Sequence, residues 1–201
     1  MNLQKLFETQ KVLRDRINYQ GEDRFEKLIL ALLVELGELC QEWRGFKFWS
    51  KNQEPRTRKL DIRKMQKVNR GEIQVQEVKE LFTNPLLEEY VDCLHFLLEI
   101  GLEEFEAYGF KYPVNYSFND YTPIKEDSVT IQFNSLFTEV GILNDVLFDK
   151  CYEVNSVEDS YENAFRIFIG LGEMLGFTWE EIESAYFEKN KINHVRQDTG
   201  Y

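Results

Sequence analysis

Cysteine is scarce in this sequence, and long apolar runs are absent. The three cysteines form no CxxC pair and cannot all join in disulfides. Cys40 and Cys93 fall on or near apolar helix faces, so we expect them to be small core residues. No apolar run is long enough to span a bilayer, and the charged, amphipathic N-terminus does not resemble a secretory signal. We therefore expect a soluble, cytoplasmic protein.

Positive charge is also in short supply. The chain has 24 Lys and Arg against 36 Asp and Glu, a net charge of -12. This balance argues against wrapping nucleic acid or lying on an anionic membrane. It does not exclude an anionic nucleotide, because metal ions can bridge acidic side chains and phosphates. A hydrophobic content of 43% predicts a packed globule, which at 201 residues forms a single domain.

No segment alternates between apolar and polar residues for long enough to predict an extended strand, so we expect an all-α fold. The periodicity favours a helical bundle of about six helices. Residues 50–84 are dense in Lys and Arg, and we expect them to be a surface insertion with one or two short helices. Residues 110–127 are expected to be a loop. The expected helices are 3–17, 23–43, 86–108, 128–150, 157–175 and a last helix capped by Thr178.

The helix expected at 23–43 carries the strongest signal. Glu35 and Glu38 each precede a residue of its apolar face, so both carboxylates lie at the edge of the core on one side of the helix. Two like charges there repel and resist desolvation unless a cation lies between them. The apolar face recurs at steps of three and four residues: Phe25, Ile29, Leu32, Leu36, Leu39 and Trp43.

The helix expected at 86–108 repeats the arrangement. Glu89 and Asp92 form a second i, i+3 pair, but Glu88 lies i, i+4 from Asp92, so spacing alone does not choose between the two glutamates. If the helices pack together, four carboxylates converge on one pocket, and oxygen-only ligands suit Mg²⁺ or Mn²⁺. The alternative is a pair of solvated acidic faces. His95, beside the Asp92 face, is expected to be a satisfied neighbour.

Two further segments each have a structural and a functional interpretation. The aromatic and basic residues 46–49 either plug the end of the bundle or offer a base-stacking platform with a lysine for phosphate. Near the C-terminus, Lys189, Asn190, Asn193 and Arg196 either form a basic helix end that favours the helix dipole or contact a base edge and phosphates.

Four pieces of the sequence together resemble the dimeric, all-α dUTPases. Gln10, in an amphipathic first helix, matches the polar residue of that family's first motif, and the resemblance extends from there to the C-terminus. The gap from Glu38 to Glu89 is longer than usual in the family, and residues 50–84 account for it. The four pieces are Glu35-Leu-Gly-Glu38, Lys47-Phe48-Trp49, Glu89-Tyr-Val-Asp92 and the ending Lys189-Asn190-Lys-Ile-Asn193-His-Val-Arg196-Gln197 through Gly200-Tyr201.

The resemblance implies a role for each matching residue. Glu35, with help from Glu38, would orient or deprotonate the attacking water. Family members form homodimers, and a partner chain would complete the pocket. The ligands of roughly two or three Mg²⁺ ions, with Mn²⁺ as a substitute, would be Glu35, Glu38, Glu89 and Asp92. Phosphate oxygens would be contacted by Lys47, Lys189 and Arg196. Uracil and deoxyribose would be surrounded by Gln10, Trp49, Asn190 and Asn193, with Tyr201 closing the site.

The implied reaction is hydrolysis of dUTP to dUMP and pyrophosphate, which keeps uracil out of DNA and supplies dUMP. The resemblance implies attack at the β-phosphorus, which would also permit hydrolysis of dUDP. No Ser or Cys is set up as a nucleophile, so no covalent intermediate is needed. Two alternatives are a related pyrophosphatase for another nucleotide such as dCTP, and a non-enzymatic helical interaction module. Such a module should tolerate Glu35→Gln and Asp92→Asn.

Overall fold

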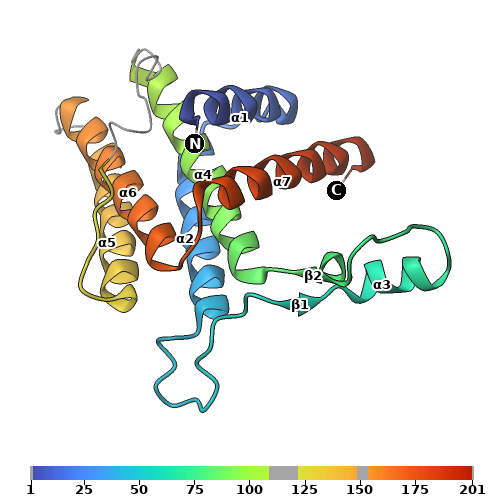
Figure 1. Cartoon of the computed structure of the whole chain (residues 1–201). Helices are drawn as coiled ribbons and strands as arrows, with labels where there is room; N and C mark the ends of the chain where they lie inside the picture. Colours follow the sequence, from blue (N-terminus) through green and yellow to red (C-terminus); the bar gives the residue numbers. More distant parts are fainter. Residues whose placement is uncertain (1, 109–121, 149–153, 201) are drawn as a thin grey trace.

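The computed structural model describes residues 2–108, 122–148 and 154–200, and this part of the chain is all-α, as predicted. Figure 1 shows α2 and α4 at the centre, α5 and α6 together on one side, and α1 and α7 crossing α4 on the other side. The helices are α1 (Leu3–Ile17), α2 (Arg24–Trp43), α3 (Ile62–Asn69), α4 (Pro85–Tyr108), α5 (Val129–Phe148), α6 (Val154–Met174) and α7 (Trp179–Thr199).

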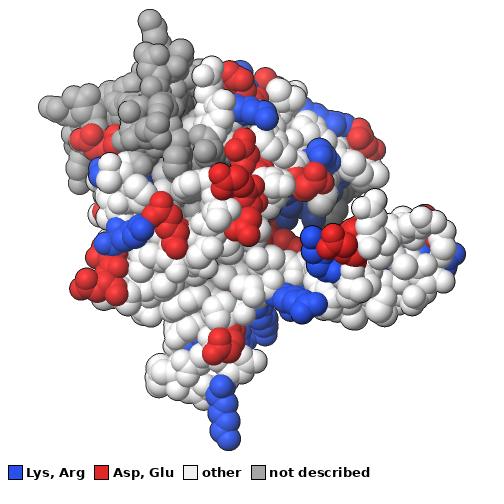
Figure 2. Space-filling view, in the orientation of Figure 1, with Lys and Arg blue, Asp and Glu red and all other residues white. Residues whose placement is uncertain are grey.

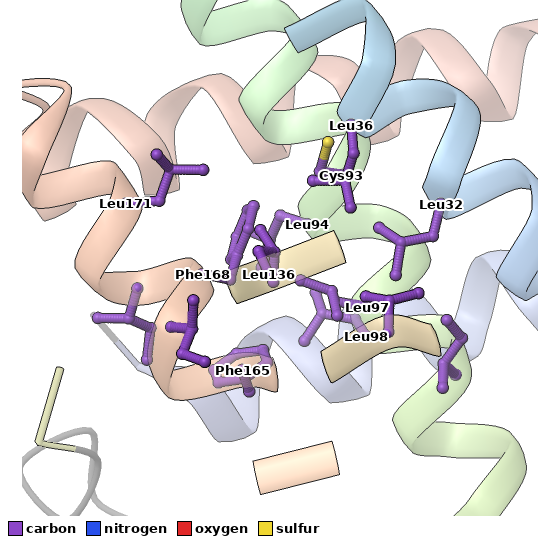
Figure 3. Close-up of a cluster of buried hydrophobic side chains, with 14 of the residues drawn as sticks. Leu32, Leu36, Cys93, Leu94, Leu97, Leu98, Leu136, Phe165, Phe168 and Leu171 are labelled. Atoms are coloured by element: carbon purple, nitrogen blue, oxygen red, sulfur yellow. The ribbon is translucent and has the colours of Figure 1, made fainter. Parts of the chain in front are cut away.

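The core lies where α2, α4, α5 and α6 meet, and it confirms the predicted apolar stripes. On α2 the buried residues are four members of the predicted face: Ile29, Leu32, Leu36 and Leu39. Figure 3 shows side chains from all four helices meeting in one cluster, among them Leu36, Leu94, Leu136 and Phe168. Cys93 is buried in this cluster and Cys40 packs against it, so both are core residues as expected. Burial of each such leucine stabilises the fold by about 2 kcal/mol.

The last helix is longer than its sequence signals indicated. Thr178 and Glu181 form the predicted capping box at its start, and Gly200, in a left-handed conformation at φ +70°, ends it after Thr199. Residues expected at the end of the helix and beyond it therefore lie on its last turns. As a result, Lys189, Asn193 and Arg196 recur at steps of four and three along a single helix face.

Residues 58–83 form an arm that extends away from the helical body (Figure 1). In the arm, β1 (Lys59–Leu60) pairs antiparallel with β2 (Phe82–Thr83), and α3 and the 3₁₀-helix η1 (Val78–Leu81) lie between them. The short helices agree with the expectation for this segment. The strands were not predicted, because two residues are too few to show an alternating pattern.

The segment before α5 is fastened to α6 by a backbone hydrogen bond from the Ile124 amide to the Arg166 carbonyl oxygen, 3.1 Å, and by the side chain of Gln132. Gln132 donates hydrogen bonds to the carbonyl oxygens of Ile124 and Ile167, both at 2.7 Å, and its own carbonyl oxygen accepts from the Glu126 amide.

The rest of the predicted 110–127 loop, up to residue 121, lies outside the described residues. Among the helices that the structure describes, none has the length and apolarity to cross a membrane.

The close approach of the segment before α5 to Gly170 on α6 predicts that a methyl group at position 170 would be strongly destabilising. A Cβ at position 170 would lie 2.0 Å from the Ile124 carbonyl oxygen, which is backbone and cannot swing away. We expect Gly170→Ala to lower the free energy of unfolding by about 1–3 kcal/mol in urea denaturation. Gly141→Ala is the matched control, because a Cβ there meets nothing within 4 Å and should stabilise α5 by about 0.5–1 kcal/mol. Equal stability of the two variants would contradict this account of the contact.

Candidate active site

The packing of α2 against α4 gathers three carboxylates. One oxygen from each of Glu35, Glu38 and Glu89 lies within 4.8 Å of the other two. Glu35 and Glu89 are half-buried and Glu38 is exposed, so the cluster lies at the edge of the core, as the sequence predicted. The structure brings Glu89, rather than the exposed Glu88, into the group.

Asp92, the fourth predicted ligand, lies one turn further along α4 and is held by α7. Its Oδ2 forms a short ion pair with Lys189 Nζ, and about a fifth of each side chain is exposed. This ion pair brings the positive charge of Lys189, from α7, to the carboxylates of α2 and α4.

Burial raises the pKa values of these groups, and for Glu35 and Glu89 the neighbouring negative charges add to it. Burial, followed by the charges of Asp92, Glu38 and Glu35, raises the pKa of Glu89 to about 7. Burial, followed by Asp92 and Glu38, raises the pKa of Glu35. Burial also raises the pKa of Asp92, although Lys189 opposes the change. The site thus has more negative charge than it can solvate, and a divalent cation would relieve it.

A cavity of about 510 Å³ adjoins the carboxylates and lies between α1, α2, α4 and α7. Its volume is that of a site for a small ligand. Glu35, Asp92 and Lys189 line it at the carboxylate cluster, so a ligand in the cavity would reach these groups. The remaining lining residues are Gln10, Leu13, Ile17, Tyr19, Arg24, Lys27, Leu28, Ala31, His95, Phe96, Glu99, Asn193, Arg196 and Gln197.

Gln10 is the centre of a buried hydrogen-bond network in the cavity wall. Its Nε2 donates to Glu99 Oε2 at 2.9 Å. Its Oε1 accepts from the Tyr186 hydroxyl at 2.9 Å and lies 2.8 Å from His95 Nδ1. Because both lone pairs of Oε1 are in use, Gln10 can offer a ligand only its second amide hydrogen.

The network also determines the tautomer and the protonation state of His95. Gln10 Oε1 can only accept, so Nδ1 of His95 must bear the hydrogen and Nε2 must have a free lone pair. Burial, with a smaller effect of Lys189, lowers the pKa of His95 to about 3, so the ring is neutral. His95 is 6% exposed, stacks on Tyr186 with ring centroids 4.3 Å apart, and its Nε2 has no partner among the described residues. The expectation of a satisfied neighbour therefore holds for only one of its two nitrogens.

A buried charge network supports this wall from behind. Arg24 donates to Glu99 Oε1 at 2.6 Å, and Arg14 Nε lies 3.6 Å from the same oxygen. Both arginines also pair with Glu103. Burial raises the pKa of Glu99, while Gln10 and the two arginines oppose that change. The network fixes Glu99, and through it the amide group of Gln10.

Besides Glu38 and Glu89, which belong to the adjoining carboxylate cluster, four predicted site residues are not among the residues that line the cavity. Lys47 and Trp49 follow the end of α2, where Lys47 bonds to Gln41 and Trp49 is 66% exposed. The helix has ended at Trp43 by then, and the chain leaves the face that bears the carboxylates. Asn190 is buried on α7, 5% exposed, and Tyr201 lies outside the described residues.

The cavity also contains residues to which the sequence analysis gave no role there. His95, Phe96 and Glu99 follow Asp92 at steps of three, four and seven, so they share its helix face. Extending the helical spacing from Asp92 toward the C-terminus would have found them. Arg24 gives no comparable sequence signal, because it belongs to the site only through the packing of α1, α2 and α4.

Comparison with known proteins agrees with this geometry. No curated protein matches the chain. A family model described as dUTPase matches residues 2–63 and 76–201, which include the three clustered glutamates, Asp92 and every residue that lines the cavity. The unmatched residues 64–75 lie in the arm. The chain therefore belongs to the all-α dUTPase family, whose members hydrolyse dUTP to dUMP.

Proposed function

We propose that this dUTPase is Mg²⁺-dependent and that Glu35, Glu38, Glu89 and Asp92 form its metal-binding set. The observation that supports this is the cluster of three glutamate oxygens within 4.8 Å of one another, at the edge of a cavity of nucleotide size. The raised pKa of Glu89, about 7, fits the same interpretation, because burial and three neighbouring carboxylates outweigh the opposing charge of Lys189.

Mg²⁺ fits this donor set because every candidate ligand is a carboxylate oxygen, with no imidazole or thiolate among the four. Cys93 is buried next to Asp92 and packs into the core instead. We expect roughly two or three ions for each site, with Mn²⁺ as a substitute. When bound, such ions neutralise phosphate charge and lower the pKa of a water molecule.

Side chains of α2 and α7 would perform the other steps of the reaction. Glu35, half-buried and in the cavity, is placed to orient the attacking water and accept its proton, with Glu38 beside it. Across the cavity, Lys189 and Arg196 would neutralise the phosphate oxygens, including those of the dUMP that leaves on attack at the β-phosphorus. The ion pair between Lys189 and Asp92 keeps the lysine in position before a nucleotide arrives.

The opposite part of the cavity suits uracil and deoxyribose. Phe96 offers an aromatic surface, and Asn193 and Gln10 offer amide groups. His95 lines this part of the cavity, and its buried Nε2 has a free lone pair whose chemistry would suit the uracil N3–H or a sugar hydroxyl once the wall opens to it. Because the ring is neutral and clamped by Gln10 and Tyr186, its tautomer is fixed before the ligand binds.

We further propose that the enzyme is a homodimer in which the partner chain helps to complete the pocket. Lys47 and Trp49 support this, since neither lines the cavity of its own chain and Trp49 is 66% exposed. In a dimer these residues can serve as the predicted phosphate and base contacts at the boundary between two chains. We also propose that Asn190 and Tyr201 lie near the sugar and base, as the family resemblance implies.

The first test of this function is a substrate panel. We expect pyrophosphate release from dUTP in Mg²⁺, none in chelator, and rates for dCTP, dTTP and UTP lower by about tenfold or more. Attack at the β-phosphorus predicts that isotopically labelled water transfers its oxygen to pyrophosphate rather than to dUMP, and that dUDP is also hydrolysed. A preference for dCTP would preserve the metal site but reassign the base contacts.

Removal of one charge from the cluster should abolish turnover. Glu35→Gln keeps the shape of the side chain but cannot accept a proton, so we expect kcat to fall by at least about 100-fold with no loss of thermal stability. Glu88→Gln is the matched control, because Glu88 is an exposed carboxylate on the same helix as Glu89 and lies outside the cluster. Activity of Glu35→Gln at the control's level would refute the role of Glu35.

Metal binding should be pH-dependent in a defined direction. Since the pKa of Glu89 is about 7, this group is protonated at about pH 6 and ionised at about pH 8. A cation binds the ionised form, so at the lower pH it must displace a proton. We expect Mg²⁺ affinity to rise between these two pH values, and calorimetry in buffers of different ionisation enthalpy to show proton release at the lower pH alone. Affinity that is flat with pH would show that Glu89 is not a ligand.

A further inference from the structure

The arm, residues 58–83, is regular in structure but buries none of its residues. Lys59 pairs with Thr83 and Leu60 with Phe82, and the Arg58 guanidinium lies 3.9 Å from the centre of the Phe82 ring. Asp61 caps α3 by accepting from the Lys64 amide at 2.9 Å. An eight-residue helix and a two-residue ladder are marginal without an apolar surface against them. A surface outside the arm is therefore needed to cover it.

The charge of the arm is opposite to that of the body. It has seven Lys and Arg against four Asp and Glu, a net charge of +3 in a chain whose total is -12, so the rest of the chain has -15. Figure 2 shows Asp and Glu side chains gathered over the helical body. On α3, Arg63 and Lys67 are one turn apart and exposed, and neither has an ion pair within the described residues.

Apolar side chains accompany these cations. Ile62 on α3 is 59% exposed, Val78 on η1 is 69% exposed and Leu60 on β1 is 37% exposed. On the side visible in Figure 2, much of the arm is uncharged. A mixed surface of cations and aliphatic groups is typical of the rim and centre of a protein interface rather than of a solvated loop.

We propose that the arm docks on the acidic body of a second copy of this chain, with α3 as its contact helix. The inference rests on the proposed homodimer and identifies a surface that holds it together. A two-fold axis would place each arm on the other chain's body, giving two identical contacts that close the assembly. A second copy fits better than nucleic acid, because the body's charge of -15 repels a polyanion and attracts the arm.

Charge reversal on α3 tests this contact without touching the active site. Arg63→Glu with Lys67→Glu changes two exposed side chains, so the monomer should fold normally by circular dichroism. The control is Lys51→Glu with Lys191→Glu, two exposed lysines outside the arm with the same change of charge. We expect sedimentation velocity to show a dimer for the wild type and the control. The dimer dissociation constant of the α3 variant should be higher by about tenfold or more, and salt should weaken the wild-type dimer.

A second experiment identifies the contact directly. We would mix isotopically labelled and unlabelled wild-type chains and couple lysines to carboxylates with a zero-length cross-linker. Mixed-isotope links from Lys64 or Lys67 to the body of the other chain would support the proposal. A wild-type dimer that the α3 variant leaves unchanged, with no such links, would overturn the arm contact and leave the homodimer standing. A monomeric wild type would overturn both, and loss of duplex-DNA retention in the α3 variant with an intact dimer would assign the arm to nucleic acid.

Discussion

The packing of α2 against α4 is the constraint on which the active site depends. Three glutamate oxygens within 4.8 Å of one another repel, and isolated helices would move them apart. The buried faces of the two helices prevent this, because Leu32, Leu36 and Leu39 pack with the residues of α4 in one core. Each buried leucine contributes about 2 kcal/mol, so the core can hold the charges together until a cation compensates them. Burial and the neighbouring carboxylates together raise the pKa of Glu89.

A second constraint acts on the other side of the cavity, where a buried hydrogen-bond network fixes the positions of the side chains. Glu99 and its arginines hold Gln10, and Gln10 holds His95 in one tautomer. Hydrogen bonds in such a buried chain reinforce one another, and none has to form when the ligand arrives. The site therefore combines a cluster of carboxylates with a wall whose hydrogen bonds are formed before a ligand binds.

Most of the fold could be predicted from the sequence because each core helix has a regular apolar stripe. The same periodicity located Glu35 and Glu38, since a helix converts spacing directly into direction. It did not locate Lys47 or Trp49, because both follow the end of α2, where the spacing of residues no longer determines which way their side chains point. Nor could it reveal the free nitrogen of His95, because that depends on contacts between residues 85 positions apart in sequence.

The site joins the two ends of the described chain. Gln10 comes from the first helix, while Lys189 and Asn193 come from the last, and Tyr186 connects them by its bond to Gln10 across 176 positions. Contacts of such high sequence separation are expected to form late, because closing a long loop costs entropy before the contact repays it. The carboxylates of α2 and α4 can therefore come together before α7 packs against them. If they bind metal as proposed, a chain folded only that far would bind metal before it could hold a ligand in the cavity.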